Sequence, residues 1–237
     1  MPVAERIHRD VVSYVRRSAR MNTAQQKAWD LHNENWVVPL DAGERDTSVA
    51  ASARVDWAAV FGREAQLMVE IGSGTGHAIT GLALAHPDAN LVAFEVFLPA
   101  VASTLGRLAR HGVTNVRLVV ADGAQALPVV FDEASVTELW TFFPDPWHKA
   151  RHHKRRLVST EFAGVVASRL TADGTWRLAT DWDDYAEAML ATLEAEPGLE
   201  NRHDGWAPRY GLRPLTKYEQ RGLDAGRTIH DLAFGRR

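Results

Sequence analysis

Short apolar runs alternate with longer amphipathic stretches along the chain from residue 67 onward. Runs rich in β-branched or aromatic residues predict strands at 67–71, 90–96, 116–120, 136–143 and 174–180, and at 228–235, which we expect at an edge of the sheet. The amphipathic stretches predict helices over 77–85, 98–111, 158–170 and 183–195. Alternation of strands and helices is typical of an α/β domain with a mostly parallel sheet and right-handed crossovers.

The first 65 residues follow a different pattern, because they are polar and rich in turn formers. They contain one helical candidate at 24–36 and a loop around 41–48. We find no internal repeat and no low-complexity tract. The pattern predicts an N-terminal arm with a helical extension over 1–65 and one α/β domain over 66–237.

Composition excludes several classes of protein. The 237 residues are 46% hydrophobic and 24% charged, as in an ordinary globular domain. Cysteine is absent, which excludes disulfides, thiolate metal sites and a cysteine nucleophile. No run approaches the roughly 18 apolar residues of a membrane span, and the N-terminus lacks the apolar core of a signal peptide. We therefore expect a cytoplasmic protein.

Charge is unevenly distributed although the net charge is only −3. Residues 147–156 carry five cations, three histidines and no acid, and five arginines lie in the first 20 residues. Such segregation can make one surface strongly positive, and the alternative for each run taken alone is a solvated face. His148, His152 and His153 lack the i, i+4 spacing and acidic partner of a helical metal site, so no metal is expected.

A glycine-rich loop follows the first predicted strand and opens a helix, with Glu70 before Gly72, Gly74 and Gly76. Glycines let backbone approach a ligand closely, and Glu95, after the next strand, could accept both hydroxyls of a ribose. A dinucleotide fingerprint would need a small residue where this chain has His77. The acid-rich pattern instead suits a cationic nucleoside cofactor, with a purely structural turn and an NAD site as the alternatives.

Two further acids follow later strands. Asp122 comes after 116–120, where it could simply cap a helix. By analogy with enzymes that share this glycine-loop pattern, it would address an adenine amine. Asp145 lies between Pro144 and Pro146 at the end of a central strand, where open α/β sheets bind ligands. A fixed carboxylate there can accept two hydrogen bonds from a planar partner such as the N1–H and N2–H₂ edge of guanine.

Several segments together resemble the bacterial tRNA (guanine-N7-)-methyltransferases, in the same order along the chain. They are SYVRRSAR (13–20), EIGSGTG (70–76), FEV (94–96), FFPDPWHKARHHKRR (142–156), ATDW (179–182) and RPLTKYEQRG (213–222). The resemblance covers the chain from about residue 13 to its end. The chain departs from the family pattern at Phe97-Leu98-Pro99-Ala100, next to the expected cofactor wall, and at Phe234-Gly235-Arg236 in the last strand.

The resemblance implies a class I methyltransferase with a Rossmann-like fold. That fold is a mostly parallel seven-stranded sheet with helices on both faces and an antiparallel last strand. It implies methyl transfer from S-adenosyl-L-methionine to N7 of the guanosine at tRNA position 46. The residues implied for the cofactor are Glu70, Gly72, Gly74, Gly76, Glu95, Asp122 and Asp145. The resemblance also implies that Asp145 is catalytic. The residues that it implies for binding the substrate are Lys149, Asp181, Thr216, Lys217, Tyr218 and Glu219.

The expected partner is tRNA, bound through the basic segments 147–156 and 13–20. The residues expected to contact its phosphates are Lys149, Arg151, Lys154, Arg155 and Arg156. Trp147 could stack on a base or pack internally, and Asp181 could hold guanine or cap the helix at 183–195. Monomer and homodimer both remain open. The alternative in the same class is a methyltransferase with another guanine-containing RNA target. The alternative from another class is a non-catalytic RNA-binding protein on a degenerate methyltransferase fold.

Overall fold

The computed structural model describes residues 20–44 and 47–237. Seven strands form one sheet in the order β3-β2-β1-β4-β5-β7-β6. Their bounds are Leu67–Ile71 (β1), Asn90–Phe94 (β2), Val116–Val119 (β3), Val136–Phe142 (β4), Leu170–Thr180 (β5), Leu199–Asn201 (β6) and His230–Arg236 (β7). Strands β1 to β5 pair in parallel, and β7 is antiparallel to both of its neighbours. The predicted fold class, with an antiparallel last strand, is confirmed.

The predicted edge position of the last strand is wrong. β7 lies between β5 and β6, and Phe234 at its centre is fully buried. The sequence analysis did not predict β6, which has three residues and, among the described strands, pairs with β7 alone. A three-residue strand carries too little periodicity to be detected. The departure from the family at Phe234-Gly235-Arg236 therefore falls on an interior strand.

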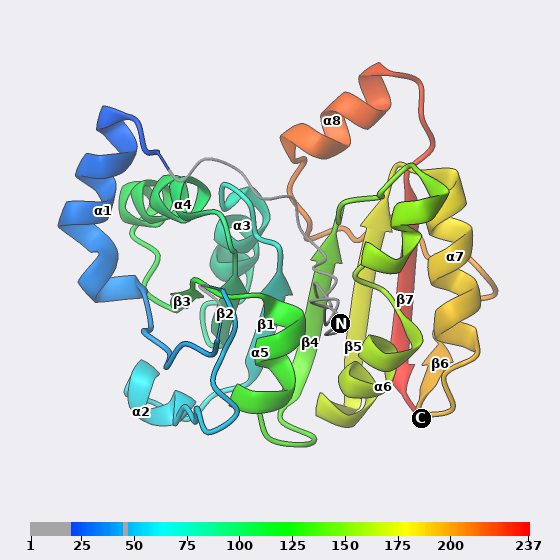
Figure 1. Ribbon diagram of the computed structural model, residues 1–237, viewed down its shortest axis with the longest axis horizontal. Coiled ribbons are helices and arrows are strands. Elements are labelled where there is room, and N and C mark those ends of the chain that lie inside the picture. The colour runs from blue at the N-terminus through cyan, green and yellow to red at the C-terminus, as the bar shows by residue number, and fades with distance from the viewer. Residues whose placement is uncertain (1–19, 45–46) are drawn as a thin grey trace, which may run out of the picture.

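Helices cover both faces of the sheet (Figure 1). Their bounds are Thr23–Trp36 (α1), Trp57–Phe61 (α2), His77–Ala85 (α3), Leu98–His111 (α4), Gly123–Val130 (α5), Thr160–Arg169 (α6), Asp183–Glu194 (α7) and Lys217–Asp224 (α8), with a 3₁₀ turn at Ala150–Arg155. The sequence missed α2, α5, α8 and this turn. α5 contains Pro128, which breaks a helical pattern, although Asp122 caps its start.

Alternating strand residues build two separate apolar cores. Met68 packs with α3 and α4, whereas its neighbour Val69 packs with α5, α6 and α7. The described part of the first 65 residues contributes side chains to both cores. Trp29 and Trp36 of α1 pack against the first core, and Trp57 of α2 lies in the second. The division of the chain at residue 65 stays a prediction.

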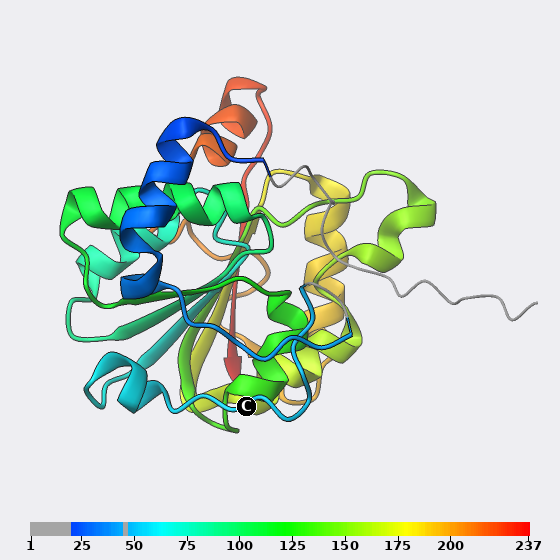
Figure 2. The same cartoon turned by 60° about the vertical axis from the view of Figure 1, so that its left-hand side comes forward.

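Two helices lie where the parallel strands end. α8 stands beyond the carboxyl ends of β4 and β5, and α1 packs across α4 (Figures 1 and 2). The side chain of Gln25 at the start of α1 donates hydrogen bonds to the carbonyl of Pro99 and the hydroxyl of Ser103 on α4. No described helix is long and apolar enough to cross a membrane.

Candidate active site

A cavity of about 280 Å³ opens at the carboxyl ends of β1, β2, β3 and β4. Nine of the sequence-predicted site residues line it, and they are Glu70, Gly72, Gly74, Glu95, Asp122, Asp145, Thr216, Lys217 and Tyr218. Three others, Lys149, Asp181 and Glu219, do not line it, and Gly76 lies just behind its wall. Binding pockets of α/β sheets form at this edge because the loops after parallel strands converge there.

The glycine loop takes a backbone conformation that disfavours side chains. Gly72, Gly74 and Gly76 all have positive φ, at 80°, 54° and 75°. A Cβ on Gly76 would lie 2.5 Å from Cγ2 of Thr104, so this glycine lets α4 pack against the start of α3. A Cβ on Gly72 would meet no atom within 4 Å, which leaves the backbone open toward the cavity.

Glu70 is the most unusual group in the cavity. It is 2% exposed, and its Oε2 has no hydrogen-bond partner among the described residues. Burial, followed by repulsion from Glu95, raises the pKa of Glu70 to about 8, although the backbone N–H of Ile79 donates to the carboxylate and opposes this shift. A buried acid with an unsatisfied oxygen is costly unless a cation or hydrogen-bond donor reaches it. The site therefore fits a cationic ligand.

Glu95 and Asp122 each hold a loop as well as lining the cavity. The carboxylate of Glu95 accepts hydrogen bonds from the backbone N–H groups of Gly74 and Phe97, both at 2.8 Å. Asp122 is the N-cap of α5, where Oδ1 accepts from the N–H of Ala124 at 3.1 Å. The capping alternative for Asp122 is thus present, and it coexists with a place in the cavity wall.

The departure from the family pattern at 97–100 reaches the cavity itself. Phe97 precedes α4 without a side-chain capping bond, Pro99 lies in the first turn, and both Phe97 and Ala100 line the cavity. Gln25 lines it as well, and the sequence did not mark this residue. A polar residue at the start of an N-terminal helix carries no local signal of a distant pocket.

The loop around Asp145 has a strained backbone. Phe143 and Trp147 both have positive φ, at 54° and 48°, and they flank the segment Pro144–Pro146. The guanidinium of Arg156 donates to the carbonyl of Pro146 at 3.0 Å. The surrounding structure thus holds Asp145 in place at the cavity wall.

Arg156 corrects one expectation about the basic segment. It is 9% exposed, pairs with Asp184 and lies 4.7 Å over the ring of Tyr185, so it anchors the loop and is not available to phosphates. Lys149, Arg151 and Lys154 are exposed. The second basic segment, at 13–20 near the N-terminus, lies outside the described residues except for Arg20.

Trp147 belongs to this basic surface and not to either core. The guanidinium of Arg155 lies 4.9 Å from the centre of the Trp147 ring, and the ring of His152 meets it edge-on at 5.8 Å. Stacking of Trp147 on a base stays a prediction.

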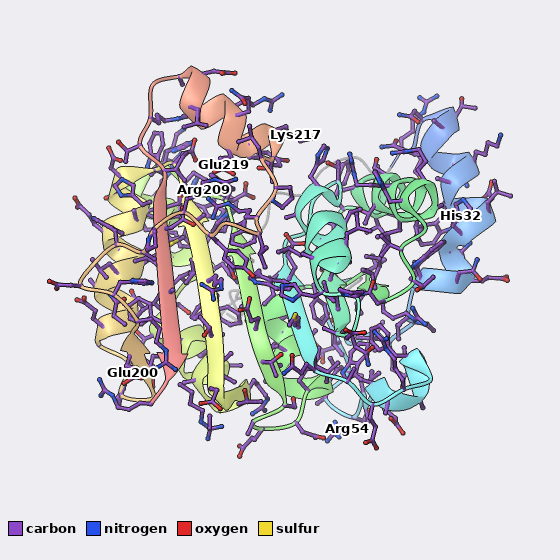
Figure 3. The ribbon with its side chains drawn as sticks, turned by 180° about the vertical axis from the view of Figure 1, so that it is seen from behind. His32, Arg54, Glu200, Arg209, Lys217 and Glu219 are labelled. Atoms are coloured by element: carbon purple, nitrogen blue, oxygen red, sulfur yellow. The ribbon has the colours of Figure 1, made fainter. Side chains whose placement is uncertain are left out.

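A buried ion-pair network corrects the expectation for Glu219. Glu219 is 1% exposed and pairs with Arg209, which lies beside it in Figure 3, and with Arg213. Arg213 also pairs with Asp231 on β7. These arginines, with hydrogen bonding outweighing burial, lower the pKa of Glu219. Glu219 therefore positions the start of α8 and does not reach the cavity, while Thr216 caps the helix and accepts from the N–H of Glu219. The sequence analysis missed this network because its pairs are six, ten and eighteen residues apart and join a loop, a helix and a strand.

Asp181 lies outside the cavity and pairs with Arg227 at 2.9 Å. The suggestion that it caps the helix at 183–195 is wrong, because Trp182 holds the cap position of α7 without a side-chain bond. A substrate role for Asp181 stays a prediction.

Comparison with solved structures supports the fold alone. The 16S rRNA methyltransferase KamB superposes with a TM-score of 0.56 at 16% identity, over 84% of this chain and 99% of that one. A variant of the 16S rRNA (adenine(1408)-N(1))-methyltransferase from Catenulisporales acidiphilia, solved with cosubstrate SAM, superposes with a TM-score of 0.54 at 15% identity. The match covers 83% of this chain and 96% of that one. These structures have the same class of sheet.

Sequence comparison is much closer. A family model described as "Putative methyltransferase" matches residues 64–232. The tRNA (guanine-N(7)-)-methyltransferase of Cutibacterium acnes is 50% identical over 98% of this chain and 85% of its own length. Proteins of the same name from Nocardioides sp. and Paraburkholderia xenovorans are 48% and 40% identical, over 97% and 100% of this chain and 88% and 87% of their own. The chain belongs to the tRNA (guanine-N(7)-)-methyltransferase family.

Proposed function

We propose that the protein transfers a methyl group from S-adenosyl-L-methionine to N7 of the guanosine at tRNA position 46, forming 7-methylguanosine. The observation that carries this proposal is the cluster of carboxylates around the glycine loop, centred on the unpartnered Oε2 of Glu70. The names of the full-length relatives support the same reaction.

The residues of the cavity fit a cationic cosubstrate. Glu70 would bind the ammonium of the methionine part, because an ion pair would satisfy its buried oxygen. Glu95 would bind the ribose, and Asp122 the adenine amine, at the ends of neighbouring strands. Gly72 and Gly74 leave the backbone free of side chains beside them. A bound pyrophosphate would meet these same carboxylates, which disfavours the NAD alternative.

The cosubstrate supplies an activated methyl group on a sulfonium. Guanine N7 has an exposed lone pair and carries no proton at neutral pH, so no side chain needs to act as a base before transfer. Asp145 would accept hydrogen bonds from the guanine edge and hold N7 in line for displacement, a proximity effect worth about 7–11 kcal/mol in favourable cases. Its carboxylate would also stabilise the positive charge that develops on the purine.

The exposed cations after the Asp145 loop would bind the RNA backbone. Lys149, Arg151 and Lys154 are free of acidic neighbours in the sequence, and Arg155 lies over Trp147. Contacts to phosphates would fix the register of the tRNA, while the cavity selects the base. Guanosine in a folded tRNA would have to move outward for N7 to reach the cavity.

The test is to incubate the protein with labelled S-adenosyl-L-methionine and unmodified tRNA, and to identify the labelled nucleoside by mass. We expect 7-methylguanosine, and none when position 46 carries adenosine. Label in another nucleoside would contradict the assigned target. Tight tRNA binding without any methyl transfer would favour the non-catalytic RNA-binding alternative.

A further inference from the structure

Two side chains able to carry positive charge line one edge of the cavity, and an arginine outside the lining contacts one of them. His77, the first residue of α3, and Lys217, the first residue of α8, both line it. Arg107 of α4 brings its Nη2 to 2.6 Å from Nε2 of His77 and donates from Nε to the carbonyl of Thr75 at 3.3 Å. Lys217 lies at the end of α8 that faces α3 (Figure 3). Three separate helices thus bring these groups together.

These cations differ from several other arginines of the structure. Arg177, Arg213 and Arg227 each pair with a carboxylate, whereas among the described residues no carboxylate lies within 4.0 Å of Arg107 or Lys217. Burial, Arg107 and Lys217 lower the pKa of His77, so its neutral ring accepts the hydrogen bond from Arg107. The start of α3 adds the positive end of a helix dipole to the same place. The edge of the cavity is therefore positive, in contrast to its acidic centre.

We propose that Arg107, His77 and Lys217 form an oxyanion subsite beside the glycine loop. The inference rests on the proposed function for the source of the anion. The α-carboxylate of the cosubstrate's methionine part and a phosphate of the nucleotide chain next to the target guanosine offer the same chemistry. Arg107 recognises the anion as a charged hydrogen-bond donor, and Lys217 supplies a second charge from a separate helix.

The carboxylate source is tested by comparing S-adenosyl-L-methionine with its decarboxylated analogue in calorimetry. The wild-type chain should bind the intact cosubstrate about tenfold more tightly, as a charge-assisted hydrogen bond requires. Arg107→Gln and Lys217→Gln should each reduce that preference. Arg110→Gln, a matched control in the last turn of the same helix, changes a neighbouring arginine and leaves the contact between Arg107 and His77 in place, so it should keep the preference.

The phosphate source is tested by the salt dependence of tRNA binding. Loss of one phosphate contact should make the slope of log K against log[salt] shallower by roughly 0.7 to 0.9 in Arg107→Gln, while the preference for the intact cosubstrate stays as in wild type. Arg110→Gln should keep the wild-type slope. A change in either measurement supports the subsite and identifies its anion.

Wild-type values for both Arg107→Gln and Lys217→Gln in both measurements would overturn the subsite. Failure of the proposed function is recognised separately, from a wild-type chain that forms no 7-methylguanosine in tRNA. If that chain still binds S-adenosyl-L-methionine or tRNA, the corresponding measurement above still tests the subsite. A chain that binds neither ligand requires another probe. In that case inorganic phosphate is titrated while the His77 imidazole signals are followed by NMR. A shift in wild type that Arg107→Gln abolishes supports the subsite, and an unchanged imidazole signal overturns it.

Discussion

Replacing Glu70 with Gln should make the ligand-free protein more stable at neutral pH while abolishing cosubstrate binding. The carboxyl is 2% exposed, its Oε2 lacks a partner among the described residues, and its pKa is raised to about 8. Glutamine has nearly the same shape and cannot ionise. The variant therefore removes the cost of keeping this carboxyl protonated in the folded chain, together with the carboxylate that would bind the ammonium.

The pH dependence gives the size and the sign of this effect. Below the ordinary pKa of 4.5 the carboxyl holds its proton in both the folded and the unfolded chain. Between pH 4.5 and about 8 only the unfolded chain releases the proton, so the stability of wild type falls as pH rises. At about 1.4 kcal/mol per pH unit the loss is about 3 kcal/mol at pH 7, and it approaches about 5 kcal/mol above pH 8.

Urea unfolding at pH 5, 6, 7 and 8 measures this effect. The stability of Glu70→Gln relative to wild type should increase by about 3 kcal/mol between pH 5 and pH 8. Glu64→Gln, at an exposed position just before the same strand, controls for loss of a surface charge and should keep the wild-type pH dependence. Parallel curves for Glu70→Gln and wild type would refute the reasoning. In calorimetry the variant should also lose the cosubstrate binding that wild type shows.

Three further changes test other parts of the site. Asp145→Asn should lower methyl transfer at saturating substrates by about a hundredfold or more with a wild-type thermal melt, and near-normal turnover would leave Asp145 a structural role only. Lys154→Ala with Arg155→Ala should make the salt slope of tRNA binding shallower by about one to two units without changing cosubstrate affinity, whereas an unchanged slope would make this run a solvated face. Gly76→Ala should destabilise the fold by about 2–5 kcal/mol in urea unfolding, because its φ of 75° disfavours a side chain and the added Cβ would lie 2.5 Å from Thr104. A loss below 1 kcal/mol would show that α4 moves away freely.

Local sequence patterns were sufficient for most of the frame of the site. The strands at 67–71, 90–94, 116–119 and 136–142 and the helices that follow the first two were predicted within a few residues. Because parallel strands end at the same edge of a sheet, their order places the glycine loop, Glu95, Asp122 and Asp145 together. The two prolines beside Asp145 marked a fixed loop, and the structure adds the positive φ of Phe143 and Trp147.

The roles of individual charges depended on packing. Arg156 and Arg155 are neighbours in one basic run, yet Arg156 turns inward to Asp184 and Pro146 while Arg155 lies on Trp147. Composition assigns both to the same surface, because it does not record the direction in which each side chain points. Because Arg156 is buried, its charge holds a loop, and only the exposed cations of the run stay candidates for binding RNA.

The sequence by itself determined the fold class, the carboxylates of the cavity and the family, because these depend on periodicity and on motifs of adjacent residues. Only the tertiary structure decided that β7 is an interior strand, that Glu219 pairs with Arg213, and that Arg107 reaches His77. Each of these contacts joins separate elements of the chain. Their energies depend on desolvation and on which groups the packing brings within a few ångströms, and a local pattern specifies neither.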